Sequence, residues 1–266
     1  MINGLVIYDE RDVEKNNSYI SWLIEEGKKY NFNLELILTK DINYKELKGN
    51  YDFSINRSRD CKVTYNLELL RIKVFNKYKF CTLGNDKLKA YDFIKSLNIK
   101  YPRVYRSLSD IDNNKRIIEK PKSGHGGTGI KILNKFDNLD FNKNVYQEFI
   151  EGYIGDIRFY IIDNKIVNCV IRKPKKDSFL SNFSKGGDVE VYRYSPKDKE
   201  IIDKILDNIE IDFGGIDFLL LNSGEILFNE FEDAVGSRML SYLGINNTME
   251  LFLNHVEQKV KGMRNI

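Results

Sequence analysis

A single acidic residue inside an apolar run limits how the C-terminal part of this chain can fold. Residues 215–221 read Gly-Ile-Asp-Phe-Leu-Leu-Leu, which is typical of a buried strand except for Asp217. A buried charge needs a cation or a hydrogen-bonding partner, so this strand has to lie beside one. A turn signal, Asn-Ser-Gly-Glu, occupies residues 222–225, and residues 226–232 read as a returning strand. The pattern predicts an antiparallel hairpin that carries carboxylates.

The length of the turn decides where these carboxylates point. A two-residue loop pairs Leu221 with Ile226 and places Asp217 opposite Glu230, with Glu232 on the same face, about 7 Å further along the strand. Such a group suits Mg²⁺ that also binds nucleotide phosphates. Alternatively, Glu230 and Glu232 lie on a solvent-facing edge and Asp217 makes one ordinary hydrogen bond. A three-residue loop would shift the register by one and send Asp217 and Glu230 to opposite faces.

The rest of the chain divides into two parts with different sequence patterns. A strand, a helix and a second strand open it, an order that indicates a small parallel sheet. A third strand and two helices follow, the second of them capped by Asn85-Asp86. Short strands divided by glycines then indicate an antiparallel α+β region. The expected elements are strand 4–8, helix 18–30, strands 34–38 and 51–55, helices 64–75 and 86–97, strands 117–120, 130–133, 145–150, 157–162 and 166–171, helix 197–208, the hairpin, and helix 248–261.

A glycine-rich loop lies between two of the expected strands. Residues 121–129 read Pro-Lys-Ser-Gly-His-Gly-Gly-Thr-Gly, and glycines let backbone N–H groups approach phosphate oxygens closely. The pattern is neither a Walker loop nor a dinucleotide fingerprint. Lys120, just before the loop, either supplies a positive charge to phosphates or is an ordinary lysine on an edge strand. His125 either touches a phosphate or is incidental to the loop.

Composition argues against several functional classes. The 42 basic and 39 acidic residues nearly cancel, which speaks against a chain that neutralises many nucleic-acid phosphates. No run approaches the roughly 20 apolar residues of a membrane helix, and the N-terminus reads as a strand rather than a signal peptide. Cys61, Cys81 and Cys169 are widely spaced and indicate neither a disulfide framework nor a zinc site. A reducing cytoplasm is the expected location.

Together these motifs resemble the ATP-grasp superfamily, and within it the RimK-type and glutathione-synthetase-like carboxylate-amine ligases, over about residues 85–232. The resemblance implies an α/β (α+β) ATP-grasp fold. A small N-terminal α/β domain would occupy residues 1–84, and the ATP-grasp domain residues 85–266. Within the latter, a central lobe (85–146) and a C-terminal antiparallel-sheet lobe (147–266) would clamp ATP.

The resemblance also implies roles for particular residues. Asn85-Asp86-Lys87-Leu88 resembles the family's helix-opening lysine motif, and Lys120-Pro121 with the glycines after it resembles the second lysine and the phosphate-covering loop. The implied nucleotide-binding residues are Lys87, Lys120, Gly124, Gly126, Gly127, Gln147, Glu148, Phe149, Ile150, Asp156, Arg158 and Ser181. The implied catalytic residues are Arg172 and Asn182, and the implied metal ligands are Asp217, Glu230 and Glu232.

The chain departs from the family pattern at one ligand. The usual third metal ligand is an Asn followed by a Pro-Gly turn, whereas Glu232 is followed here by Asp-Ala-Val-Gly. Arg238, shortly after, is either a clamp for a substrate carboxylate or a surface residue. Arg57 and Arg59 follow the third strand and hint at an acidic acceptor, or are surface charges.

The expected activity is therefore ligation of a carboxylate to an amine. ATP and Mg²⁺, with Mn²⁺ as an alternative, would convert the carboxylate to an acyl phosphate that an amine attacks, with release of ADP and phosphate. The expected substrates are small molecules or peptides rather than nucleic acid or membrane, and family likeness suggests a homo-oligomer. Two alternatives stay open: a kinase of the same fold that phosphorylates a small molecule, and a nucleotide-binding module without turnover.

Overall fold

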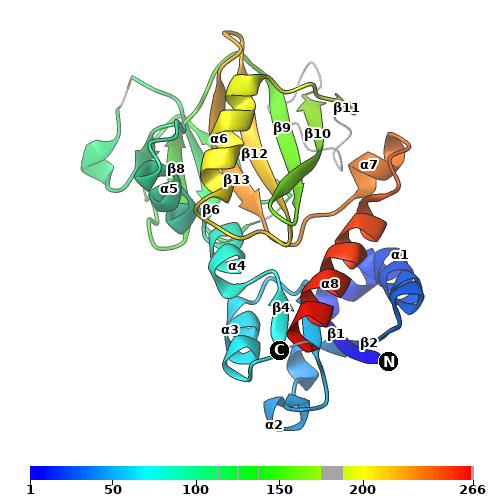
Figure 1. Ribbon diagram of the computed structural model, residues 1–266. Coiled ribbons are helices and arrows are strands. Elements are labelled where there is room, and N and C mark those ends of the chain that lie inside the picture. The colour runs from blue at the N-terminus through cyan, green and yellow to red at the C-terminus, as the bar shows by residue number, and fades with distance from the viewer. Residues whose placement is uncertain (113, 125, 137, 175–187, 265–266) are drawn as a thin grey trace.

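Three β-sheets form the framework of the computed structural model of this chain (Figure 1). The structure describes residues 1–112, 114–124, 126–136, 138–174 and 188–264. Within these ranges no helix is both long and apolar enough to cross a membrane. The sheets differ in strand direction as the sequence predicted.

The first sheet is parallel, with strand order β2-β1-β3-β4. One buried face packs against α1 and the other against α2 and α3. Aspartate side chains cap α1 and α3 by accepting hydrogen bonds from backbone N–H groups of the first turn. Its elements are β1 (Ile2–Tyr8), α1 (Glu10–Gly27), β2 (Phe32–Leu38), α2 (Tyr44–Leu47), β3 (Phe53–Asn56), α3 (Cys61–Leu69) and β4 (Lys73–Phe75).

The helix predicted over residues 64–75 is wrong in its second half. The helix α3 ends at Leu69, and Arg71 adopts a left-handed conformation (φ 61°) that turns the chain into β4. The apolar spacing of this stretch fits a helix, but Ile72 and Val74 both fill the core beneath the parallel sheet. Ile72 and Val74 therefore follow the two-residue period of a strand, although the same stretch also fits the spacing of a helix. The short helix α4 (Tyr78–Asn85) was not predicted.

Two antiparallel sheets make up the middle of the chain. The smaller has the order β5-β8-β6-β7 and the larger β11-β10-β9-β12-β13. They are joined directly by β8 and β9, while α5 and α6 pack on the larger sheet. Their elements are α5 (Lys87–Ser96), β5 (Val104–Tyr105), β6 (Ile117–Pro121), β7 (Lys131–Leu133), β8 (Asn144–Glu148), β9 (Tyr153–Ile162), β10 (Lys165–Lys173), β11 (Asp188–Val191), α6 (Pro196–Leu206), β12 (Phe213–Leu221) and β13 (Ile226–Glu232).

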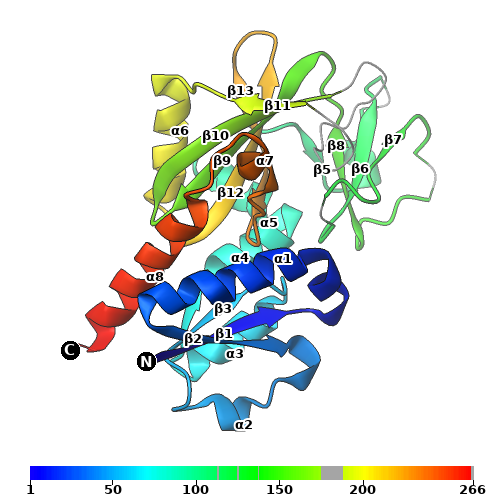
Figure 2. The same ribbon diagram turned by 90° about the vertical axis from the view of Figure 1, so that its right-hand side faces the viewer.

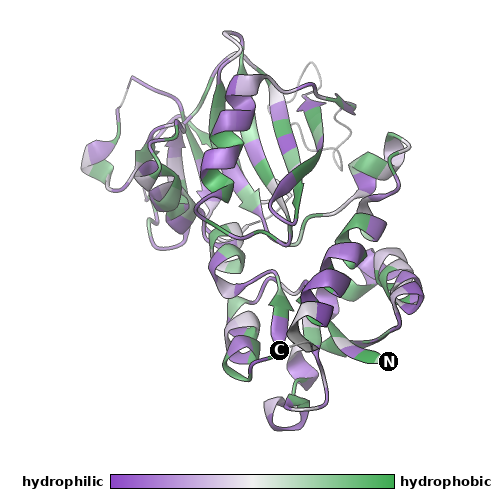
Figure 3. Cartoon of the chain, in the orientation of Figure 1, coloured by the Kyte–Doolittle hydropathy of each residue, from purple (hydrophilic) through white to green (hydrophobic). Residues whose placement is uncertain are grey.

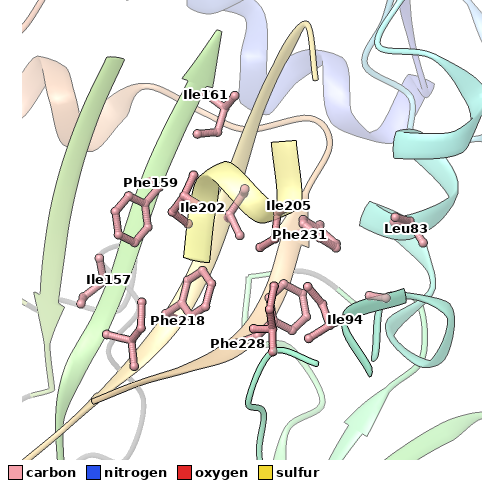
Figure 4. Close-up of a cluster of buried hydrophobic side chains, with 14 of the residues drawn as sticks. Leu83, Ile94, Ile157, Phe159, Ile161, Ile202, Ile205, Phe218, Phe228 and Phe231 are labelled. Carbon is pink, nitrogen blue, oxygen red and sulfur yellow. The ribbon is translucent and has the colours of Figure 1, made fainter. Parts of the chain in front are cut away.

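The two faces of the larger sheet differ in chemistry, as the banded hydropathy of its strands suggests (Figure 3). On β9, Ile157, Phe159 and Ile161 point to α6 and form an apolar core with Phe218 (Figure 4). The residues between them on β9 point to the opposite face, and so does Asp217 on β12. The core thus anchors one face of each strand and leaves the other for charged side chains.

The C-terminal helices return the chain to the first sheet. After α7 (Arg238–Tyr242), α8 (Thr248–Arg264) runs beside α1 in both views (Figures 1 and 2). Phe252 and Val256 of α8 share one core with the N-terminal strands. The division at residue 84 stays a prediction, and this packing shows that the end of the chain supports its beginning.

The turn between β12 and β13 is longer than predicted. Leu220 pairs with Ile226, so the predicted pairing of Leu221 with Ile226 is wrong. The Leu221 N–H donates to the Glu225 carbonyl (2.9 Å), which closes a loop of three residues. By the sequence argument alone, such a loop would have separated the carboxylates.

A β-bulge at Asn229 reverses this shift. Phe218 pairs with Phe228, but the next pair is Asp217 with Glu230, so Asn229 is the extra residue on β13. The predicted pairing of Asp217 with Glu230 is therefore confirmed, although by a different route. The bulge also lets Phe228 point into the core while Glu230 points to the opposite face.

Candidate active site

A cavity between the two antiparallel sheets gathers most of the predicted site residues. Figure 2 shows the sheets, with β6 and β8 on one side and β9, β12 and β13 on the other. The α5 helix supplies one further wall residue. The predicted residues that line the cavity are Lys87, Lys120, Gly124, Gly127, Gln147, Glu148, Phe149, Ile150, Asp156, Arg172, Glu230 and Glu232.

Three carboxylates meet beside this cavity, and two of them, Glu230 and Glu232, line it. Asp217, Glu230 and Glu232 each bring one oxygen to within 4.8 Å of the others. The predicted convergence is confirmed, whereas metal binding by these residues stays a prediction. The oxygen-only donor set fits a hard cation such as Mg²⁺.

Two buried guanidinium groups already accompany these carboxylates. Arg158 donates to both oxygens of Asp217 (2.7 and 2.6 Å) and to Glu232 Oε1 (2.9 Å). Arg172 donates to Asp217 Oδ2 (2.7 Å), while its Nε is buried with no hydrogen-bond partner among the described residues. Asp217, which is fully buried, therefore has the partners that its place in an apolar strand required. A carboxylate has about four acceptor positions, so these contacts leave room for a metal.

These neighbours set the protonation of the carboxylates. Burial raises the pKa of Asp217, but the charges of Arg158 and Arg172 outweigh it and hold that pKa below its ordinary value. Burial also raises the pKa of Glu230, but the charge of Lys87 opposes it, and the pKa lies below its ordinary value. The pKa of Glu232 is raised by burial despite Arg158. Glu232 is thus the carboxylate that a cation would affect most.

The two predicted phosphate lysines both lie near Glu230. Lys87 opens α5 behind the capping carboxylate of Asp86, and its Nζ donates to Gly124 O (2.5 Å) and lies 3.4 Å from Glu230 Oε2. Lys120 Nζ donates to Asn229 Oδ1 (2.8 Å). Burial lowers the pKa of Lys120 to about 8, with Glu230 opposing the shift. Both lysines therefore point into the cavity from fixed positions.

The glycine-rich loop covers the cavity from the β6 side. Gly126 and Gly127 have φ values of 63° and 70°, a conformation that other residues adopt with strain. Gly124 and Gly127 line the cavity, but Gly126 does not. Two of the three glycines named thus line the cavity, whereas phosphate binding by the loop stays a prediction.

The strand β8 and the residues after it form the back wall. Gln147 is buried and donates through Nε2 to Tyr91 OH (3.0 Å). The N–H groups of Glu148 and Phe149 donate to backbone carbonyls of neighbouring segments, and the Arg116 guanidinium lies 4.7 Å from the centre of the Phe149 ring. Backbone contacts from Glu148 and Phe149 to a nucleotide would therefore use their carbonyl groups.

Several predicted residues lie elsewhere. Ser181, Asn182 and His125 fall outside the described residues. Arg158 and Asp217 do not line the cavity but support Glu232 and Arg172, which do.

The arginines suggested for an acidic acceptor have different surroundings. Arg57 is buried, donates to Tyr8 OH (2.9 Å) and Val235 O (2.8 Å), and lies 4.5 Å from the Tyr19 ring centre. It joins the N-terminal sheet to the segment after β13, so it serves the fold. Arg59 is half-exposed and its charge reaches Glu232, and Arg238 is exposed.

Asn229 is the most informative residue that the sequence analysis missed. It forms the bulge, binds Lys120 through its side chain and accepts from Tyr91 OH through its carbonyl (2.8 Å). A polar residue after three apolar ones was the available signal. The other missed wall residues are Ile118, Pro121, Thr128, Ile130, Tyr153 and Leu219.

Comparison with known proteins identifies related sequences. The RimK-like ATP-grasp domain family matches residues 67–254. The chain is 28% identical over 251 residues to the uncharacterized protein MG011 of Mycoplasma genitalium, which covers 90% of this chain and 87% of that protein. It is 33% identical over 179 residues to the ribosomal protein bS6–L-glutamate ligase of Escherichia coli, covering 60% of this chain and 59% of that ligase.

Solved structures share the arrangement of sheets. The D-alanine–D-alanine ligase of Bacillus anthracis complexed with ATP matches with a TM-score of 0.74 at 18% identity, covering 100% of this chain and 99% of that chain. A RimK domain ATP-grasp protein of Sphaerobacter thermophilus matches with a TM-score of 0.70 at 14% identity, covering 95% of this chain and 99% of that chain. The predicted ATP-grasp fold is confirmed.

Proposed function

The chain belongs to the RimK-like ATP-grasp family of ATP-dependent ligases that form C–N bonds, and we propose that it activates a carboxylate as an acyl phosphate and joins it to an amine. One observation carries the proposal. Lys87, Lys120 and Arg172 line the same cavity, between the two antiparallel sheets, as Glu230 and Glu232. A triphosphate with a divalent cation needs this combination of charges.

The nucleotide would lie along the cavity with its phosphates at the lysines. Lys87 and Lys120 enter from α5 and β6, and Gly124 and Gly127 present the backbone of the loop. The base would then reach the back wall at residues 147–150, and Asp156 on β9 would be placed for the ribose. This orientation puts the γ-phosphate nearest the carboxylates.

Asp217, Glu230 and Glu232 are the residues that would hold Mg²⁺. Their oxygens are close enough to share one ion, and the guanidinium contacts at Asp217 do not exhaust its acceptor positions. When bound, Mg²⁺ would offset the negative charge of the phosphates.

Arg172 would act on the transferred group. It is 7% exposed, lines the cavity, and is oriented by its contact with Asp217, while its Nε lacks a partner among the described residues. A buried, unpaired N–H aimed at a reacting phosphoryl group would stabilise the charge that develops there. The walls of the two sheets would meanwhile keep water from the acyl phosphate.

We infer that one substrate is an amino acid or peptide. Relatives of the chain are named as glutamate ligases, and one of them as a ligase of glutamate to a ribosomal protein. L-Glutamate is therefore the first amine to test.

A ligase assay with paired substrates tests the proposal. The protein would be incubated with ATP, Mg²⁺ and pairs of amino acids or peptides, with phosphate release and product mass as the two readouts. We expect phosphate release that requires both partners, and a product whose mass is that of the pair less one water. A stable phosphate ester formed on a substrate hydroxyl without an amine would instead identify a kinase, and ATP binding without turnover for any pair would favour a regulatory module.

A further inference from the structure

Two cysteine thiols meet where α3 packs against α4, which in turn contacts β13. Cys61 is the first residue of α3 and Cys81 lies in α4, and their Sγ atoms are 3.3 Å apart. A disulfide requires about 2.05 Å, so an approach of about 1.2 Å would join them. Cys61 is half-exposed, whereas Cys81 is 1% exposed. A reagent from solution can therefore reach the Cys61 thiol, and the buried Cys81 thiol is in contact with it.

The two thiols differ in reactivity. The pKa of Cys61 is lowered, chiefly because the Cys81 thiol donates to it. That contact and burial raise the pKa of Cys81. Thiolates rather than thiols attack disulfides, so Cys61 is the attacking group and Cys81 the resolving one.

The pair is connected to the carboxylates through Asp233. This buried residue follows Glu232 directly, and its carboxylate accepts a hydrogen bond from Asn85 Nδ2 (3.3 Å), which also donates to the Cys81 sulfur (3.7 Å). A Cβ at Gly84 would lie 2.8 Å from the Asp233 backbone nitrogen, so α4 packs tightly against this segment. A change at the Cys81 sulfur therefore acts on the residue that adjoins the predicted metal ligand.

We propose that Cys61 and Cys81 form a reversible disulfide site that reacts with low-molecular-weight disulfides and alters the carboxylate site through Asp233. The Cys61 thiolate attacks one sulfur of the disulfide RSSR, which gives Cys61–S–S–R and one RSH. Cys81 then loses its proton and attacks the Cys61 sulfur, which forms the Cys61–Cys81 bond and releases the second RSH. Two protein thiols are oxidised and one disulfide is reduced. The Cys81 sulfur moves toward Cys61 and weakens its contact with Asn85 Nδ2, which also donates to Asp233.

Glutathione redox buffers test the disulfide in the whole chain. We expect intact mass and peptide mapping to show a Cys61–Cys81 bond in the wild type and in Cys169→Ala, a matched control because Cys169 is buried in β10 away from the pair. Cys61→Ser should stay free of glutathione at position 81. Cys81→Ser should stop at the mixed disulfide on Cys61. A wild type whose Cys61 is alkylated readily but never pairs with Cys81 overturns the site.

The second part, which rests on the proposed function, is tested by ATP binding. Calorimetry would measure the Kd for ATP over a series of Mg²⁺ concentrations, in reduced and in oxidised protein. The quantity compared is the Mg²⁺ concentration at which ATP affinity reaches half of its maximum. We expect a several-fold shift in the wild type and none in Cys61→Ser. Equal Mg²⁺ dependence in both forms of the wild type would refute the link through Asp233. Absence of ATP binding in the reduced wild type would instead contradict the proposed function, leaving the disulfide result intact.

Discussion

The protonation of Lys120 should control the affinity for ATP between pH 7 and pH 9. This lysine is 7% exposed, and burial lowers its pKa to about 8, against the charge of Glu230. Below that pH the amine is charged and attracts phosphate, and above it the amine is neutral. The charged fraction falls from about 90% at pH 7 to about 10% at pH 9. If only the charged form binds phosphate, the Kd for ATP rises about tenfold, or about 1.4 kcal/mol.

Two variants separate this effect from other titrations. Lys120→Arg keeps its charge throughout this range, so its Kd should not rise between pH 7 and pH 9. Asn229→Asp places a carboxylate at the atom that Lys120 contacts at 2.8 Å, which raises the lysine pKa and moves the loss of affinity to higher pH. Isothermal calorimetry at saturating Mg²⁺ gives each Kd. A tenfold rise in Lys120→Arg as in the wild type would refute the assignment.

Three further predictions concern the charges and the packing around the cavity. Asp217→Asn should lower turnover, measured by phosphate release, by orders of magnitude. It should also lower the free energy of unfolding in urea by about 3 kcal/mol, because Arg158 and Arg172 lose a buried partner. Glu230→Gln should lower turnover in the same way but change the free energy of unfolding little. Chelation of divalent cations should stop turnover until Mg²⁺ or Mn²⁺ is returned, while circular dichroism stays unchanged. Arg57→Ala should cost about 2 kcal/mol in urea unfolding through its lost hydrogen bonds, with a normal Kd for ATP.

Most of the fold followed from periodicity in the sequence. Strands with alternating or continuous apolar residues were predicted with the right type, and the helix after Asp86 also with nearly the right bounds. The helix α1, in contrast, begins at Glu10 behind Asp9, eight residues before the predicted start. The prediction over residues 64–75 was wrong because Val74 fits a helical spacing and also fills the core as part of β4. Only the packing of the parallel sheet decides between the two.

The carboxylate pair was predicted correctly for a reason that was incomplete. Counting back from a two-residue turn gave Asp217 opposite Glu230, and the structure reaches this pair through a three-residue turn and a bulge at Asn229. The two departures cancel because each shifts the register by one residue. Counting residues from the turn could give neither the bulge at Asn229 nor its contact with Lys120. The position of the bulge depends on the packing of Phe228 and Phe231, which both point into the core on the other face.

The partners of Asp217 explain why three carboxylates can gather without destabilising the chain. Asp217 pairs across the sheet with Glu230 on one side and with Arg158 on the other, and Arg172 approaches from the next strand. The sequence showed that Asp217 needed a cation or a hydrogen-bonding partner, but Arg158 lies 59 residues away, and only the strand order β10-β9-β12-β13 makes the two neighbours. Because these cations belong to the fold itself, the sheet does not depend on a metal for its charge balance. Divalent ions should therefore govern the reaction and the binding of ATP, and leave folding largely unaffected.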